Sequence, residues 1–207
     1  MTFPLIVSFY TKNTLYQLEV QNLIASCKNY DLEMCIEGIE SFGSWELNCA
    51  YKPFFIYQKW QEFKRPLLWV DADAIFVRKP EWISAFNADV AARIDPLLSL
   101  NHPSKVMSGT VYINYTKPAE RILQEWIVAC KEGLLGKEAG SEFWDQTALR
   151  DALFLKEHGA VVESLPLAYT KIFDHKTDLL EAPCPVIEHY QASRRLKNLI
   201  NSSDLNN

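Results

Sequence analysis

No run of apolar residues in this 207-residue sequence approaches the roughly 18 that a membrane-spanning helix needs. Residues 2–7 also lack the positively charged start of a signal peptide. We therefore expect a cytoplasmic protein without a membrane span, and peripheral attachment to a membrane stays open.

An excess of basic residues is absent as well. Lysine and arginine total 21 against 26 aspartates and glutamates, which gives a net charge of -5. Nucleic-acid binding is not expected, because nothing supplies a broad basic face for counterion release. A phosphorylated ligand would have to be held locally, by a metal ion and a few placed lysines or arginines.

The five cysteines are odd in number and show no C-x-x-C spacing. This pattern argues against both a disulfide framework and a structural zinc site. We expect the thiols to be reduced and mostly buried.

What is present favours one α/β domain over residues 1–207, with a polar tail from about residue 200. The apolar residues 4–10 predict a strand, Thr14 and Gln17 have capping-box spacing before a helix, and residues 31–37 predict a second strand. This β-α-β opening is typical of a parallel sheet. Further along, we expect a loop over 41–48, helices beginning near Lys52-Pro53, at 80–83, after Pro118 and over 142–157, and strands at 89–93, 106–114, 160–163 and 185–189.

The central feature is the segment from Pro66 to Phe76. Leu67 to Val70 are four consecutive apolar residues and predict a strand buried on both faces. Asp71 and Asp73 follow, and in an extended chain their side chains would point to the same side. Since no lysine or arginine lies between Arg65 and Arg78, a divalent cation is the expected neutraliser. The alternative is a polar turn or a helix cap.

Three other residues stand out. Asp145 shares the inward stripe of its predicted helix, although it could simply favour the positive end of the helix dipole. Gly109 lies inside a predicted strand, which indicates a bulge or the close approach of a ligand. His189 ends the last strand, and a lone histidine is more often structural than a ligand.

The chain resembles a known family in its ordered motifs: Tyr10-Thr11, Lys52-Pro53-Phe54, Trp69-Val70-Asp71-Ala72-Asp73, Ser108 to Asn114, Trp144-Asp145-Gln146 and His189 to Arg194. It is similar to glycosyltransferases of the GT-A fold, in the nucleotide-diphospho-sugar transferase group, over residues 4–197. The resemblance implies a mostly parallel central sheet flanked by helices on both faces. It also implies transfer of a sugar from a nucleotide-diphosphate donor, commonly a UDP-sugar, to an unidentified acceptor hydroxyl.

The resemblance also implies roles for individual residues. Asp71, Asp73 and His189 would hold Mn²⁺ or Mg²⁺ on the donor diphosphate. Asp145 would be the catalytic carboxylate, as a general base if the reaction inverts configuration, or as an orienting and charge-stabilising group if it retains configuration. The remaining substrate-binding positions would be Tyr10, Thr11, Lys52, Ser108, Gly109, Gln146 and Arg194.

Two other classes remain open. A noncatalytic nucleotide-sugar-binding protein would keep the fold without turnover. A haloacid-dehalogenase-like phosphatase also uses Asp-x-Asp, but on its first strand and with a later acidic pair, whereas a β-α-β unit precedes Asp71 here. A sugar nucleotidylyltransferase is disfavoured because residues 4–17 contain no glycine for a phosphate loop.

Overall fold

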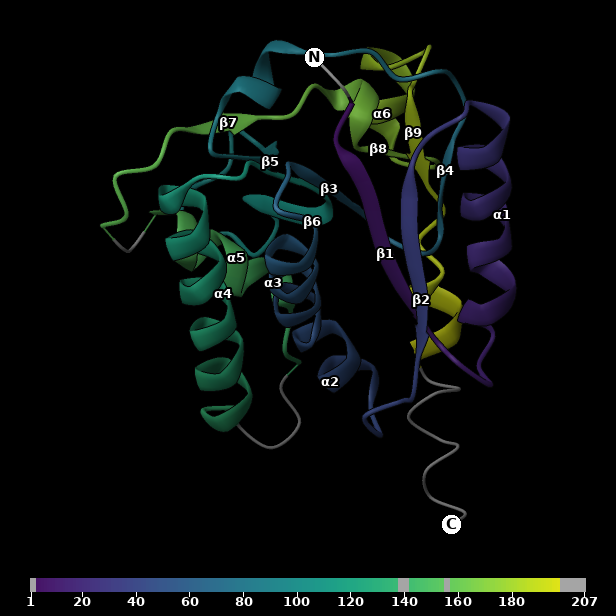
Figure 1. Cartoon of the computed structure of the whole chain (residues 1–207). Helices are drawn as coiled ribbons and strands as arrows, with labels where there is room; N and C mark the ends of the chain where they lie inside the picture. Colours follow the sequence, from purple (N-terminus) through teal and green to yellow (C-terminus); the bar gives the residue numbers. More distant parts are fainter. Residues whose placement is uncertain (1–2, 138–141, 155–156, 198–207) are drawn as a thin grey trace.

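A six-stranded sheet with the order β2-β1-β3-β6-β5-β7 forms the centre of the fold (Figure 1). The computed structural model describes residues 3–137, 142–154 and 157–197, so the expected polar tail lies outside the described residues. The strands of this sheet are β1 (Leu5–Thr11), β2 (Met34–Ile39), β3 (Leu67–Val70), β5 (Val90–Ile94), β6 (Val106–Ile113) and β7 (Val162–Ser164).

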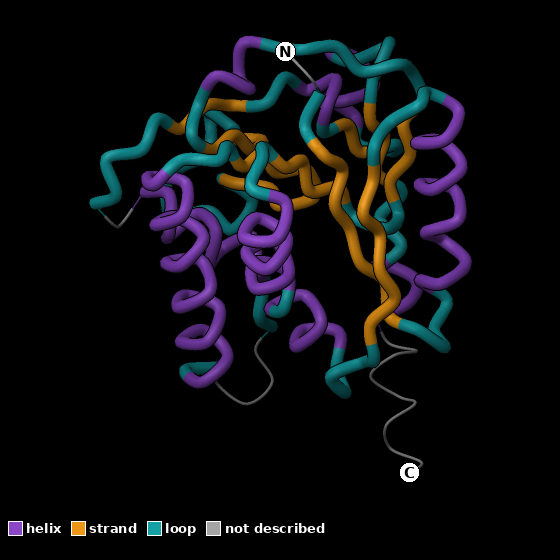
Figure 2. The backbone as a smooth tube through the Cα atoms, in the orientation of Figure 1, coloured by secondary structure: helices purple, strands orange, loops and turns teal. Residues whose placement is uncertain are grey.

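Helices cover both faces of the central sheet (Figure 2). One face packs against α3 (Lys52–Phe63), α4 (Lys117–Leu135) and α5 (Asp145–Phe154), with α2 (Trp45–Ala50) beside them. The other face packs against α1 (Tyr16–Asn29) and a second sheet. The expected arrangement of helices on both faces is confirmed.

The alternation of side chains along the strands explains these two cores. In β3, Leu67 and Trp69 join the core beneath α3, α4 and α5, while Leu68 and Val70 join the core beneath α1. All four are buried, as their consecutive apolar character predicted. The strand on which the acidic pair depends is therefore fixed by hydrophobic packing on both sides.

The central sheet is mostly parallel, as expected, with one antiparallel strand in it. The β1-α1-β2 unit is present, and β1 runs parallel to both β2 and β3. However, β6 runs antiparallel to β3 and to β5, and β5 is parallel to β7. Among the described strands of this sheet, three of the five neighbouring pairs are parallel.

A smaller sheet was not predicted. It has the order β4-β9-β8, with β4 (Ala74–Phe76) antiparallel to β9 (Ile187–His189) and β8 (Lys171–Ile172) parallel to β9. The short helix α6 (Lys176–Glu181) follows β8. Because β4 begins directly after Asp73 and pairs with β9, the two sheets meet at the acidic motif.

Two local predictions are wrong. The segment 41–48 is not all loop, since Ser44 caps α2 by accepting a hydrogen bond from the Leu47 amide. Residues 80–83 do not form a helix, and a 3-10 turn over Ser84–Asn87 comes only afterwards. The reason is tertiary: the Tyr169 hydroxyl binds both the amide and the carbonyl of Glu81, which holds this segment extended.

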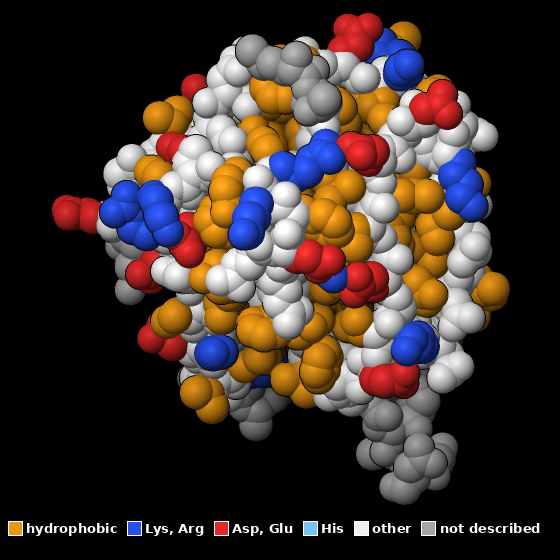
Figure 3. Space-filling model, viewed as in Figure 1, with side chains coloured by type: hydrophobic (Ala, Val, Ile, Leu, Met, Phe, Trp, Pro, Cys, Tyr) orange, Lys and Arg blue, Asp and Glu red, His pale blue; other side chains and the backbone are white. Residues whose placement is uncertain are grey.

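The described residues on the face shown in Figure 3 form no broad basic area. On the described part of the face in Figure 3, lysines and arginines lie among aspartates and glutamates and apolar side chains. None of the helices in the described ranges is long and apolar enough to cross a membrane.

Candidate functional site

The sequence motifs meet in one cleft, at the carboxyl ends of the neighbouring strands β1 and β3 of the central sheet. Side chains from β1, α1, α2, α3, β3, β6, α5, β8 and β9 line it. A ligand crevice at the carboxyl ends of strands is the usual arrangement in open α/β sheets. The predicted residues in its lining are Tyr10, Thr11, Lys52, Asp71, Asp73, Ser108, Gly109, Asp145, Gln146 and His189.

The acidic pair lies in a tight turn and not in an extended chain. The Ala74 amide donates to the Asp71 carbonyl at 3.0 Å, which closes the turn between β3 and β4. The Asp73 carboxylate accepts a hydrogen bond of 2.6 Å from the Ala192 amide. The two carboxylates do converge, but through this turn and its contact with the segment after β9, so the argument from strand alternation was wrong.

Asp71, Asp73 and His189 form a cluster that could hold a metal ion. Each offers one ligand atom, and these atoms lie within 4.8 Å of one another. The His189 Nε2 is 2.8 Å from the Thr110 hydroxyl oxygen, which fixes the ring. When Nε2 carries the proton and donates it to Thr110, Nδ1 keeps a free lone pair for a cation.

Gly109 makes room for this cluster. A Cβ at this position would lie 3.0 Å from the His189 Cε1, 3.1 Å from its Nδ1, and 3.5 Å from Oδ2 of Asp71. The β5–β6 pairing also jumps from Ala92–Val111 to Arg93–Met107, so Ser108–Thr110 bulges away from β5. The bulge expected at Gly109 is confirmed, and the absence of a Cβ there avoids tight contacts with the His189 ring.

The pKa shifts in the cluster also fit a cation site. Burial lowers the pKa of His189 to about 4, against the opposing effect of Asp71, so the ring is neutral at neutral pH, as a metal-binding imidazole must be. Burial and the charge of Asp71 raise the pKa of Asp73 to about 7. Positive charge beside the pair would favour the ionised form of Asp73.

Lys52, which the resemblance gave a substrate-binding role, supplies a cation beside the acidic pair. Its ammonium lies 3.0 Å from Oδ1 of Asp71 and 2.9 Å from Oδ2 of Asp145. Although burial acts to lower the pKa of Lys52, the two carboxylates raise it above its ordinary value. The lack of basic residues near Asp71 in the sequence was therefore misleading, because α3 brings Lys52 to it in space.

Lys52 does not balance the whole site. When Asp71, Asp73 and Asp145 are ionised, three carboxylates face one ammonium and a neutral His189. Two negative charges are then left over, the charge that one divalent cation would balance. The donor set of two carboxylates and one imidazole suits Mn²⁺ or Mg²⁺ chemically.

Asp145 lies where its predicted helical stripe placed it, in the first turn of α5 and buried. The Ser108 hydroxyl donates to its Oδ2 at 2.7 Å, the oxygen that also faces Lys52. Among the described residues Oδ1 has no hydrogen-bonding partner, and the residue lines the cleft. Gln146, next in sequence, also lines the cleft and donates to the Pro103 carbonyl at 2.9 Å.

The opposite end of the cleft is formed by Tyr10 and Thr11 at the end of β1. A Cβ on Gly38 of the neighbouring strand would come within 2.9 Å of the Tyr10 ring, so the glycine leaves space for that ring. Thr11 is buried, and its hydroxyl oxygen is 2.8 Å from that of Thr14. These two residues line the cleft on the far side of Asp71 from Asp145.

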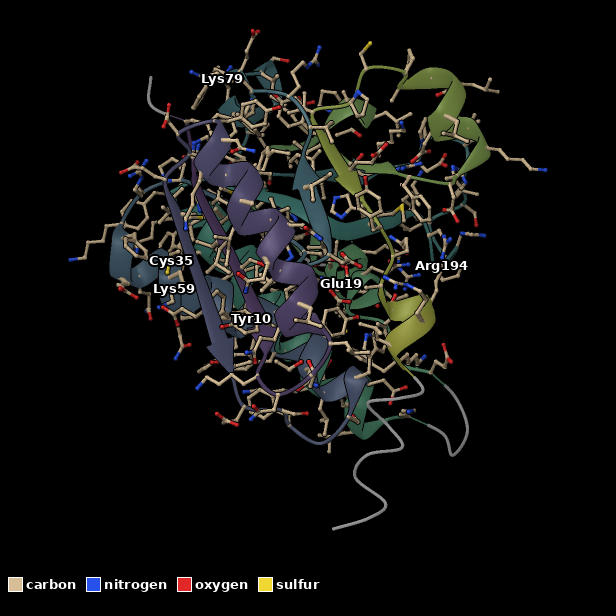
Figure 4. The ribbon with its side chains drawn as sticks, turned by 90° about the vertical axis from the view of Figure 1, so that its right-hand side faces the viewer. Tyr10, Glu19, Cys35, Lys59, Lys79 and Arg194 are labelled. Carbon is tan, nitrogen blue, oxygen red and sulfur yellow. The ribbon has the colours of Figure 1, made fainter. Side chains whose placement is uncertain are left out.

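The structure does not bring Arg194 into the cleft lining. It donates to Asp174 at 2.6 Å, and its side chain is 52% exposed. Figure 4 shows Arg194 near the edge of the molecule, away from Tyr10. Arg195 likewise binds Glu19 on α1. Their basic character in the sequence therefore does not place them at the site.

Several cleft residues were missed by the sequence analysis. Four of them, Trp144, Thr110, Gln191 and Ser193, lie within the motifs quoted above but were given no role. The others carry no local signal because distant segments bring them together. They are Phe9, Tyr16, Trp45, Asn48, Cys49, Met107, Thr170 and Ile172.

Comparison with solved structures identifies the fold. No protein-family model matches the sequence, and no curated protein matches it. A glycosyltransferase involved in glycosylation of the major capsid of PBCV-1 is 16% identical with a TM-score of 0.64, over 99% of both chains. The glycosyltransferase GlyE of Streptococcus pneumoniae TIGR4 is 17% identical with a TM-score of 0.57, over 99% of this chain and 62% of that one.

A third similar structure is the galactosyltransferase LgtC in complex with donor and acceptor sugar analogues. It is 14% identical with a TM-score of 0.51, over 96% of this chain and 95% of that one. The chain therefore has the GT-A fold of glycosyltransferases, as its ordered motifs predicted. At these identities, the similarity establishes the fold.

Proposed function

We propose that the protein is a metal-dependent glycosyltransferase that moves a sugar from a nucleotide-diphosphate donor, a UDP-sugar, to an acceptor hydroxyl. The observation that carries the proposal is the convergence of Asp71, Asp73 and His189 within 4.8 Å, in the cleft of a GT-A fold. The three similar structures are all glycosyltransferases, and LgtC is described with donor and acceptor sugar analogues.

The cleft offers a position for each part of the donor. The nucleoside would lie against Tyr10 and Thr11 at the end of β1, and the diphosphate beside Asp71 and Asp73. A Mn²⁺ or Mg²⁺ ion at this cluster would stabilise the negative charge on the departing diphosphate. The sugar would then extend past the bulge of β6 toward Asp145 and Gln146.

The residues of the chain would share three tasks. Lys52 keeps a positive charge between the diphosphate position and Asp145, whose Oδ2 it contacts. Ser108 fixes Oδ2 of Asp145, which leaves Oδ1 to accept a hydrogen bond from a sugar hydroxyl. The buried floor around Lys52 restricts water, which strengthens these charge interactions.

The direct test measures donor binding with and without metal. UDP, GDP and their common sugar conjugates are titrated calorimetrically into the protein with Mn²⁺, with Mg²⁺ and with a chelator. We expect UDP-sugars to bind only with metal, and Asp73→Ala to abolish this binding. The matched control is Asp174→Asn, which removes an exposed carboxylate paired with Arg194 outside the cleft lining and should bind as the wild type does.

Turnover separates an enzyme from a noncatalytic binder. UDP release from the preferred donor is followed with water and with a panel of methyl glycosides as acceptors. Metal-dependent release of UDP is the expected result. Binding of UDP-sugars without any release would make the protein a nucleotide-sugar binder, and no binding of any nucleotide with metal present would overturn the proposal.

A further inference from the structure

Thr170 has a buried hydroxyl that lacks a partner in the described part of the chain. The residue is 5% exposed and lines the cleft, and its Oγ1 makes no hydrogen bond. Buried hydroxyls are nearly always hydrogen-bonded, because an unpaired one loses its contacts with water and gains nothing in return. An unpaired hydroxyl in the wall of a binding cleft therefore points to a ligand group as its partner.

The surroundings of Thr170 hold it firmly in this position. Its amide donates to the Leu167 carbonyl at 3.0 Å, and its carbonyl accepts from Arg93 at 3.3 Å. Two residues later, the Ile172 amide donates to Asp178, which is itself bound by Arg93. The amide and the carbonyl of Thr170 are thus both hydrogen-bonded, and its hydroxyl is the polar group without a partner among the described residues.

The sheet order shows which part of a donor would reach Thr170. Tyr10 lies near the end of β1, Asp71 directly follows the neighbouring β3, and β6 with its bulge comes next. Arg93, which binds the Thr170 carbonyl, lies on β5 one strand further along and opposite Met107. Thr170 and the proposed nucleoside position therefore lie on opposite sides of the metal cluster, so the sugar is the part of the ligand on the Thr170 side.

We infer that the Thr170 hydroxyl forms a hydrogen-bonding subsite for a hydroxyl group of a sugar in the cleft. A threonine hydroxyl both donates and accepts, and so does a sugar hydroxyl, whereas a phosphate oxygen at neutral pH only accepts. The subsite would select sugars that carry a hydroxyl at the matching position. This inference rests on the proposed function, and the sugar belongs either to the donor or to the acceptor.

The test compares Thr170→Val with Thr170→Ser. Valine keeps the branched shape and removes the hydroxyl, whereas serine keeps the hydroxyl. Ser8→Ala is the matched control, because the Ser8 hydroxyl is also buried and unpaired among the described residues but lies outside the cleft lining. In the ligand-free protein, the melting temperature of Thr170→Val should equal or exceed that of the wild type, since no hydrogen bond is lost. A clear decrease would show that the hydroxyl has a partner within the protein and would overturn the inference.

Two measurements, the affinity for the donor and the KM for the acceptor, show whether the sugar belongs to the donor or to the acceptor. If the donor is the source, Thr170→Val weakens UDP-glucose or UDP-galactose binding about fivefold to tenfold with Mn²⁺ and leaves UDP binding unchanged. If the acceptor is the source, donor binding and donor hydrolysis are unchanged, and KM for a methyl glycoside acceptor rises by a similar factor. Thr170→Ser and Ser8→Ala should resemble the wild type in both assays.

A failure of this inference can be distinguished from a failure of the proposed function. Unchanged donor affinity in Thr170→Val, without a loss of transfer to any methyl glycoside, would overturn the inference and leave the proposed function standing. Wild-type protein that binds no UDP-sugar with metal would overturn the proposed function, and the inference with it.

Discussion

The ammonium of Lys52 lies 2.9 Å from Oδ2 of Asp145, and both side chains are more than nine-tenths buried. The same ammonium lies 3.0 Å from Asp71, so one lysine joins the proposed metal cluster to the proposed catalytic carboxylate. Removing the charge of Lys52 would leave the Asp145 carboxylate buried without compensation. The first prediction follows from this contact.

Lys52→Met should destabilise the protein by roughly 3–5 kcal/mol, the usual cost of removing one partner of a buried ion pair. The measurement is urea-induced unfolding. Lys12→Met is the control, because Lys12 pairs with Glu40 at the surface and should contribute at most about 1 kcal/mol. In the double variant Lys52→Met/Asp145→Asn, part of the loss should be recovered, since one unpaired charge is gone. Strict additivity would contradict the proposed coupling.

Gly109→Ala should weaken metal binding without changing any charge. The new Cβ would lie 3.0–3.1 Å from the His189 ring, so the ring or the bulge must shift by a few tenths of an ångström. Calorimetric titration with Mn²⁺ should show an affinity reduced by about tenfold or more, the size of effect seen when a ligand's orientation is disturbed. The control is Gly159→Ala, because a Cβ added at Gly159 would meet nothing within 4 Å and should leave metal binding unchanged. Gly159 has a φ of +64°, which is unfavourable for alanine, so this variant is a control for metal binding and not for stability. Equal affinities in Gly109→Ala and wild type would argue against His189 as a ligand.

Arg194→Ala should leave donor binding and turnover within about twofold of wild type, because its exposed ion pair with Asp174 is worth little and lies outside the cleft lining. The sequence motif gave it a substrate-binding role, so this variant separates the two interpretations. Steady-state kinetics with the preferred UDP-sugar provide the measurement. A large rise in KM would mean that the arginine moves into the cleft when the donor binds.

Acid should weaken the fold partly through Asp178. Burial alone would raise its pKa, but hydrogen bonds from Arg93 and the Ile172 amide outweigh this and lower the pKa below its ordinary value. Because the folded pKa is the lower one, the unfolded state binds more protons on acidification. The stabilisation from Asp178 is therefore complete above the unfolded pKa of about 3.9 and is lost as the pH falls through the folded pKa.

The measurement is the free energy of unfolding between pH 7 and pH 2.5 for wild type and Asp178→Asn. The variant should be less stable at pH 7, and the difference should shrink in the acid range as the wild-type carboxylate is protonated. Asp174→Asn, at an exposed ion pair, should follow the wild-type curve. A constant difference between Asp178→Asn and wild type at all pH values would show that ionisation of Asp178 is not the cause.

The parts of the fold that could be predicted were those with strong local signals. The apolar run Leu67–Val70 specified a strand buried on both faces, and the glycine within the apolar strand β6 specified a bulge. The Asp-x-Asp motif lay where expected because it directly follows that strand. In contrast, β4 has only three residues, too few for a period to be visible, and it exists because β9 pairs with it.

The charges of the site could be predicted less well, because sequence distance says little about contact in space. Lys52 lies on a different element from Asp71 but reaches it, whereas Arg194 follows His189 closely and points elsewhere. The unpaired hydroxyl of Thr170 is a property of the packed structure and has no sequence signal. Local pattern thus located the carboxylates, and only the tertiary structure identified their partners.

The meeting of two sheets at the acidic turn has a mechanical consequence. Asp71 directly follows β3 of the large sheet, whereas Asp73 leads into β4 and His189 ends β9, both in the small sheet. An ion bound by all three residues would link the two sheets. Its removal should then let the small sheet open separately, with faster amide hydrogen exchange in β4 and β9 than in β1 and β3.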